Sequence, residues 1–196
     1  MVELTMMETR IAPDNEPEDA RGDEIWTAIR DAVAEEAGNE PVLASFLHAT
    51  VLKHARLEDA LSFHLAGKLS TATLSDMLIR ELIHEAFASD PSIGAAIRED
   101  LKAFRERDPA SRGFAEPFLN YKGFHALQCY RVAHWLWKNS RHGLAMFLQN
   151  RISEVFSADI HPAAAIGKGI LVDHGTSVVI GETSVVEDNV SILHEV

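Results

Sequence analysis

The sequence contains 196 residues, enough for one large domain or two small ones with cores of their own. Eighteen lysines and arginines oppose thirty aspartates and glutamates, which gives a formal net charge of −12. An acidic chain repels phosphate backbones and anionic lipids, so we expect no nucleic-acid partner and no membrane partner. The single cysteine, Cys129, excludes an internal disulfide and a cysteine-based zinc cluster. Because the sequence has no long apolar run and no secretory signal, we expect a cytoplasmic protein.

The first segment, residues 1–24, is strongly acidic. It holds eight acidic residues and two arginines, so its net charge of −6 is half of the total. It also contains Pro13 and Pro17, no aromatic residue and no sustained apolar periodicity. This composition predicts a solvated, disordered tail whose removal changes stability little.

Residues 25–157 show the apolar spacing of amphipathic helices. The stripes run through Leu57, Ala60, Leu61, His64 and Leu65; through Leu74, Met77, Leu78 and Leu82; through Ile93, Ala96, Ile97, Leu101 and Phe104, interrupted by Asp100; and through Leu127, Tyr130, Ala133, His134 and Trp137. Prolines mark boundaries: Pro41 and the pair Asp90-Pro91 suit helix starts, and Asp108-Pro109 suits a helix end. The segment therefore predicts an all-α domain of about six or seven helices.

A six-residue period begins at Ile160. Aliphatic residues recur six apart, with Ser184 the single exception, at Ile160, Ile166, Val172, Val178, Val190 and Val196. This repeat is typical of a left-handed parallel β-helix, in which three six-residue sides make one coil of about 18 residues. We therefore predict the fold class α+β, with a helical domain over 25–157 and a β-helix over 158–196.

The predicted β-helix is incomplete. Residues 160–196 supply about two coils, and a solenoid needs roughly three repeats and a capping unit. The sequence stops at Val196, which is itself a core position of the repeat. We expect either a chain truncated relative to its ancestor or a partner that covers the open edge, and we expect an oligomer.

Several strings give the sequence a family resemblance that covers about residues 24–194. They are PVLASFLHATVLKH, RDPAS, YKGFHALQCYRVAHWLW, FLQNRIS, DIHPAAAIGKGILVDHGTSVVIGET and SVVEDNVSIL. Together they resemble serine acetyltransferase, the hexapeptide-repeat acyltransferase that starts cysteine synthesis. The resemblance implies acetyl transfer from acetyl-CoA to the hydroxyl of L-serine, with acetyl-CoA as cosubstrate and no resident cofactor. It also implies feedback inhibition by L-cysteine, trimers or dimers of trimers, and O-acetylserine sulfhydrylase as a partner through a docking tail absent from this sequence.

Four residues are candidates for the site. The resemblance makes His174 the catalytic base, Asp159 its partner, and Asp108 and Asp173 ligands of serine. A histidine suits proton removal near neutral pH, and the fifteen-residue offset from Asp159 places the pair on adjacent coils near a corner. Structural roles remain open: Asp159 can cap the entry to the β-helix, and Asp108 can end a helix. Most positions that would contact acetyl-CoA fall beyond Val196, so we assign none.

Three other functions are alternatives to serine acetylation. A truncated, weakly active chain could serve mainly as an oligomerisation module, and a hexapeptide acetyltransferase could act on sugars, although the RDPA and KGFHALQ strings argue against sugars. A zinc enzyme of the γ carbonic anhydrase type would need a histidine pair five apart. His161, His174 and His194 are thirteen and twenty apart, so we expect no metal.

Overall fold

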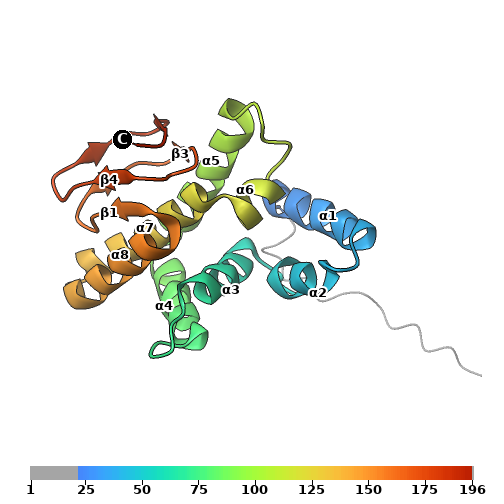
Figure 1. Ribbon diagram of the computed structural model, residues 1–196, viewed down its shortest axis with the longest axis horizontal. Helices are drawn as coiled ribbons and strands as arrows, with labels where there is room; N and C mark the ends of the chain where they lie inside the picture. Colours follow the sequence, from blue (N-terminus) through green and yellow to red (C-terminus); the bar gives the residue numbers. More distant parts are fainter. Residues whose placement is uncertain (1–21, 196) are drawn as a thin grey trace, which may run out of the picture.

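A computed structural model describes residues 22–195, so the predicted acidic tail lies almost wholly outside the described residues. Helices occupy the chain from Glu24 to Phe156, and short strands follow (Figure 1). The helices are α1 Glu24–Asn39, α2 Ala44–Leu47, the π-helix η2 His48–Leu52, α3 Leu57–Leu69, α4 Asp76–Ser89, α5 Pro91–Arg107, α6 Ala115–Asn120, α7 Lys122–Lys138 and α8 His142–Phe156. The strands are β1 Ala158–Ile160, β2 Ala165–Ile166, β3 Leu171–Val172, β4 Val178–Ile180, β5 Val185–Val186 and β6 Ser191–Ile192.

Local sequence signals explain several helix ends. Asp90 caps α5 by accepting a hydrogen bond from the Ser92 amide at 3.0 Å, and Pro91 is the first helical residue, as predicted. Asp108 ends the same helix, also as predicted. The prediction for Pro41 was wrong, because Pro41 lies in a turn and α2 starts at Ala44.

The helical core uses the predicted stripes in α3 and α5 but a different face of α4. In α4 the buried residues are Ile79, Leu82, Ile83, Ala86 and Phe87. Met77 and Leu78, which were predicted to be buried, are 64% and 49% exposed. Both sets follow the helical period, and packing against α3 selects the second.

Helix α7 lies at the centre of the molecule and is buried on all sides. Every residue from 123 to 133 is buried, and α7 contacts α4, α5 and α8 as well as β1 and β3. The single buried face predicted for this helix was therefore too narrow. A helix surrounded by other elements needs no polar face, although its sequence still carries Gln128 and Arg131, whose polar groups require partners.

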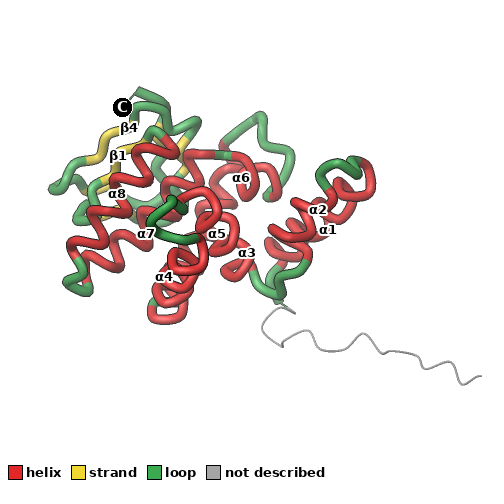
Figure 2. Tube along the Cα trace, turned by 60° about the horizontal axis from the view of Figure 1, so that its bottom comes forward, coloured by secondary structure: helices red, strands yellow, loops and turns green. Residues whose placement is uncertain are grey.

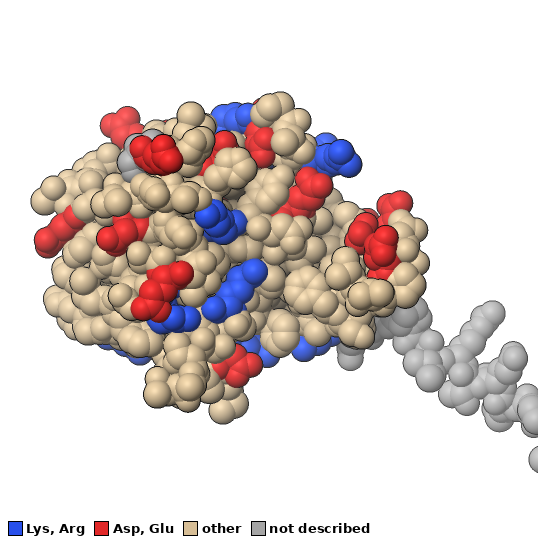
Figure 3. Space-filling view, viewed as in Figure 1, with Lys and Arg blue, Asp and Glu red and all other residues tan. Residues whose placement is uncertain are grey.

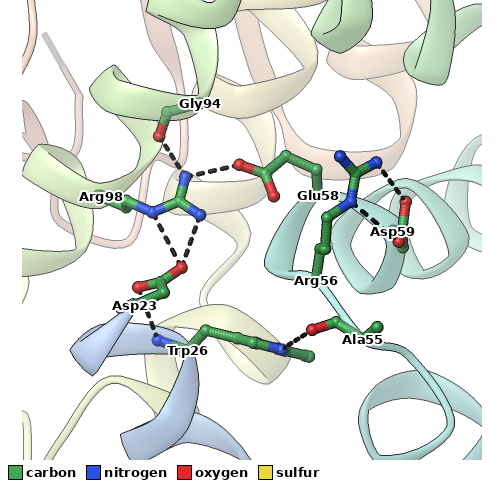
Figure 4. Close-up of polar contacts among 8 residues, drawn as sticks. All are labelled: Asp23, Trp26, Ala55, Arg56, Glu58, Asp59, Gly94 and Arg98. Carbon is green, nitrogen blue, oxygen red and sulfur yellow. Dashed lines mark hydrogen bonds and ion pairs between the residues drawn. The ribbon is translucent and has the colours of Figure 1, made fainter. Parts of the chain in front are cut away.

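Arg98 of α5 joins three helices (Figure 4). Its Nη1 donates to Oε1 of Glu58 in α3 at 2.6 Å, and its Nε and Nη2 donate to Oδ2 of Asp23 at 3.0 and 2.6 Å. Oδ1 of Asp23 in turn caps α1 by accepting from the Trp26 amide at 3.1 Å. The arginine thus clamps α1 against α3 and α5, beside a cavity of about 600 Å³.

The strands form the three sides of a parallel β-helix at the end of the molecule opposite α1 and α2 (Figures 1 and 2). Strand β1 pairs with β4, β2 with β5, and β3 with β6, all in parallel. The predicted fold class, a helical domain followed by a β-helix, is confirmed. Ser157, in the left-handed conformation with φ 61°, ends α8 and turns the chain into β1.

The coil is longer than predicted. Partners in the register are Ala158 with Val178, Ala165 with Val185, and Leu171 with Ser191, an offset of 20 residues at each side. The expected 18-residue coil was therefore wrong. The two additional residues lie between Val172 and Ile180, at the corner that contains His174. Val178 concealed the insertion, because it is a buried aliphatic residue at the next hexapeptide position.

Charged groups of both signs are interspersed on the face shown in Figure 3. Acidic side chains lie over the β-helix and over the α1 end, and basic ones lie between them. Between residues 22 and 195, no helix combines the length and the apolar character needed to cross a membrane.

Candidate active site

The candidate site is the extended corner of the first coil, residues 173–177. Three residues of this corner have left-handed backbones: His174 with φ 56°, Gly175 with φ 70° and Ser177 with φ 59°. A tight turn forms within it, since the Gly175 amide donates to the Asp173 carbonyl at 2.6 Å. Left-handed conformations are unfavourable for residues other than glycine, so the corner holds His174 in a strained position.

His174 projects into solvent. Its side chain is 74% exposed, and Nε2 lies 3.7 Å from Oδ1 of the neighbouring Asp173. The ring also meets His194 of the next coil in an edge-to-face arrangement, with centroids 6.2 Å apart. An exposed imidazole beside a carboxylate is accessible to a substrate and can accept a proton from it.

Asp159 lies on β1, directly opposite Val179 of β4. Its Oδ1 accepts a hydrogen bond of 2.6 Å from Nε2 of Gln149 in α8. Within the described residues Asp159 and His174 share no direct hydrogen bond. A link through a water molecule, which the fifteen-residue spacing also allowed, stays a prediction.

The two predicted serine ligands, Asp108 and Asp173, both influence the pKa of the Tyr121 hydroxyl. Asp108 follows the last residue of α5, and its Oδ1 accepts from the Ala110 amide at 2.8 Å. Burial raises the pKa of Tyr121, and the carboxylates of Glu116, Asp108 and Asp173 raise it further. Two segments distant in sequence therefore bring carboxylates to one neighbourhood, at the start of α7.

Residues at the start of α7 are the part of the site that the sequence did not reveal. Nζ of Lys122 donates to Oγ1 of Thr176, a residue of the corner 54 positions later. Gly123 packs against Val172 and Gly175. Lys122 and Gly123 do belong to the YKGFHALQ string, but only the tertiary structure shows that this string meets the corner. Gln149, in the FLQNRIS string, was missed for the same reason.

Other candidate chemistry in the described residues is unsupported. Burial strongly raises the pKa of the Cys129 thiol, so this cysteine is a poor nucleophile. Among residues 22–195 no group of three His, Cys, Asp or Glu side chains is placed to hold a metal ion. A second cavity, of about 590 Å³, lies between α5, α7 and the β-helix, and its lining does not include His174.

The helical domain, the parallel coil and the histidine-bearing corner together define a hexapeptide-repeat protein. Residues 25–129 match the family model described as "Serine acetyltransferase, N-terminal". A probable serine acetyltransferase 1 of Oryza sativa subsp. japonica is 52% identical over 188 residues, covering 95% of this chain and 62% of the rice protein. The chain belongs to the serine acetyltransferase family.

Solved structures agree with this assignment. A serine acetyltransferase from Brucella abortus strain S19 in complex with coenzyme A superimposes with a TM-score of 0.86 and 45% identity, covering 88% of this chain and 69% of that one. A serine acetyltransferase from Neisseria gonorrhoeae in complex with serine gives a TM-score of 0.86 and 47% identity, covering 87% of this chain and 71% of that one. The chain spans less than two thirds of the length of the curated relatives that it matches, between 53% and 63% for three of them.

Proposed function

We propose that the protein transfers an acetyl group from acetyl-CoA to the hydroxyl of L-serine, forming O-acetyl-L-serine and CoA. The observation that carries this proposal is the exposed imidazole of His174, presented on a strained corner beside Asp173. Membership of the serine acetyltransferase family supports it. The relatives with bound coenzyme A and bound serine support the choice of the two substrates.

His174 is the general base of the proposed reaction. The imidazole removes the proton of the serine hydroxyl as its oxygen attacks the thioester carbonyl of acetyl-CoA. The tetrahedral intermediate then expels the CoA thiolate, which takes the proton back from the imidazolium. The attack is direct, and acetyl-CoA is a cosubstrate, so the reaction as proposed needs no resident cofactor.

The carboxylates take two roles in the proposal. Asp108 and Asp173, whose charges both raise the pKa of Tyr121, bind the ammonium group of serine by charge. Asp159 stabilises the imidazolium of His174, through a bridging water where the two side chains are not in direct contact. Gln149 supports this role of Asp159, because it binds one carboxylate oxygen and leaves the other for such a contact.

Assembly and regulation form the second part of the proposal. The β-helix exposes Val179, Val185 and Leu193 to 66%, 74% and 55%, and such apolar side chains favour association. We propose trimers, or dimers of trimers, in the cytoplasm. We also propose feedback inhibition by L-cysteine at the serine site and a complex with O-acetylserine sulfhydrylase. Family membership is the sole support for these two properties. The alternative function, an oligomerisation module with little activity, is favoured by the same exposed valines.

A thiol-release assay tests the proposal. Acetyl-CoA is offered with L-serine, with L-threonine or with a hexose, and free CoA is measured with a thiol reagent. We expect release that depends on L-serine, saturates with it and declines when L-cysteine is added. Equal CoA release with the hexose would show that the acceptor is a sugar and not specifically serine. No release above the acceptor-free rate, from a protein that sediments as an oligomer, would favour the oligomerisation module.

A further inference from the structure

The corner that carries His174 stores backbone strain. His174 and Ser177 have β-carbons but adopt φ values of 56° and 59°. A left-handed backbone is unfavourable for a residue with a β-carbon, so it persists only when its surroundings hold it in place. A corner with two such residues therefore needs contacts from outside itself.

Backbone contacts supply part of that support. The Ser177 amide donates to the Ser157 carbonyl, and the Glu195 amide donates to the Thr176 carbonyl, both at 2.9 Å. These bonds fix the end of the corner, where the chain enters β4. They do not reach His174 or Gly175.

The start of α7 supports the remaining part. A β-carbon on Gly123 would lie 2.1 Å from the Val172 carbonyl oxygen, and one on Gly175 would lie 3.0 Å from the Gly123 α-carbon. Helix and corner thus meet backbone to backbone at Val172 and Gly175, which lie before and after His174 in the sequence. Nζ of Lys122 adds a third contact by donating to Oγ1 of Thr176. His174 therefore lies within a segment that α7 holds from Val172 to Thr176.

We propose that Lys122 is a positioning residue for the proposed reaction: by holding Thr176, it fixes the corner in the conformation that presents the His174 imidazole. The inference rests on His174 being the base. Lys122 has no contact with the imidazole that would let it transfer a proton, so it acts through the backbone of the corner. Among the described residues, Thr176 is the hydrogen-bond partner of its ammonium group.

The kinetic test compares three variants. Lys122→Met removes the ammonium group, and we expect kcat to fall about 10- to 100-fold because a general base displaced by about 1 Å loses that much rate. KM for serine and for acetyl-CoA should stay within about threefold, since the proposed serine ligand Asp173 is held separately by its amide hydrogen bond of 2.8 Å to the Ile192 carbonyl. Lys122→Arg should recover most of the rate. The matched control is Lys168→Met, which truncates an exposed lysine at another corner of the same coil.

Coupling provides a second kinetic test. Thr176→Val removes the acceptor, so the double variant with Lys122→Met should be no slower than the slower single variant. Additive losses would overturn the proposal. A raised KM at unchanged kcat would do so too, since Lys122 would then bind substrate. A Lys122→Met rate equal to that of Lys168→Met would equally reject it.

A measurement without substrate separates this inference from the proposed function. The amides of Gly175 and Ser177 are hydrogen-bonded in the corner. In Lys122→Met they should exchange with deuterium at least about tenfold faster, while Lys168→Met leaves them unchanged. Unchanged exchange in Lys122→Met overturns the positioning role even if the parent is active. Faster exchange in Lys122→Met, together with a parent that acetylates no serine, would keep the role of Lys122 in holding the corner and reject the proposed function.

Discussion

Oδ1 of Asp100 in α5 accepts a hydrogen bond of 2.9 Å from the backbone amide of Ile170, 70 residues later in the β-helix. The other oxygen of the same carboxylate accepts from Arg131 and Gln128 of α7. Asp100 is fully buried and Arg131 is 8% exposed. One carboxylate therefore joins two helices and the first coil, and Arg131 extends the link by donating to the Gly167 carbonyl at 2.9 Å.

Replacing Asp100 by asparagine should destabilise the protein strongly. The change leaves the buried guanidinium of Arg131 without its counter-charge, which costs about 3–5 kcal/mol. Urea unfolding followed by circular dichroism measures the loss. The control is Glu99→Gln, which breaks an exposed ion pair with Lys102 and should cost about 1 kcal/mol or less. Equal losses in the free energy of unfolding for the two variants would show that the buried pair of Asp100 and Arg131 contributes no more than an exposed ion pair.

Glycine at position 123 should be irreplaceable. The methyl group of Gly123→Ala would overlap the Val172 carbonyl, so the helix or the corner must shift, at a cost of about 1–3 kcal/mol. Activity should fall with stability, because the same shift moves His174. Gly67→Ala, in α3 with open space around it, should instead stabilise by about 0.5–1 kcal/mol. Thermal unfolding of both variants checks the contrast, and a stabilised Gly123→Ala contradicts it.

Stability should decline in mild acid because two histidines are buried without charge. Burial lowers the pKa of His64 to about 4 and that of His125 to about 3, from 6.5. Their rings lie 5.1 Å apart. Between pH 6.5 and about 4 the unfolded chain binds more protons than the folded chain, so stability falls as pH falls, by up to about 1.4 kcal/mol per pH unit for each imidazole.

The variant that isolates this effect is His64→Gln. Glutamine keeps a donor for the Leu119 carbonyl, which His64 contacts at 2.9 Å, but does not titrate. The free energy of unfolding should therefore change less between pH 7 and pH 5 than in the parent. If the variant and the parent showed the same pH dependence, His64 would not contribute to the loss of stability in acid, and carboxylates would account for it.

The proposed base can be tested by substitution. His174→Ala should lower the rate of serine acetylation about 10²- to 10⁴-fold, the usual contribution of a general base. Asp159→Ala should cost less, since it orients the imidazole and does not carry the proton. His48→Ala, an exposed histidine of the helical domain, is the control. Turnover by His174→Ala within about threefold of the parent would reject the assignment.

Periodicity predicted the architecture because it reports which residues are buried. The change from a helical period to a six-residue period near residue 158 lies where the helices end, at Phe156. The same signal failed at Val178, since a buried aliphatic residue six positions after Val172 hides a two-residue insertion. In α4, overlapping stripes were both consistent with a helix, and only the packing against α3 decides between them.

Pairings across long sequence distances could not be predicted. Asp100 interrupts an apolar stripe in the sequence, yet it is buried because Arg131 and Ile170 surround it with donors. The resemblance named His174, Asp159, Asp108 and Asp173 but not the residues that hold them. Lys122 and Gln149 are unremarkable in sequence, and their contacts exist only once α7 and α8 lie against the β-helix.

Asp23 performs two tasks with one carboxylate, capping α1 through Oδ1 and binding Arg98 through Oδ2. The packing of α1 therefore depends on a residue that precedes its first helical position. An expression clone trimmed to start at Glu24 would retain every helical residue of α1, yet it would lose the clamp and leave the Trp26 amide uncapped. Safe trimming for crystallisation or labelling must keep Asp23 and a residue before it, so that the new terminal ammonium does not compete with Arg98 for the carboxylate.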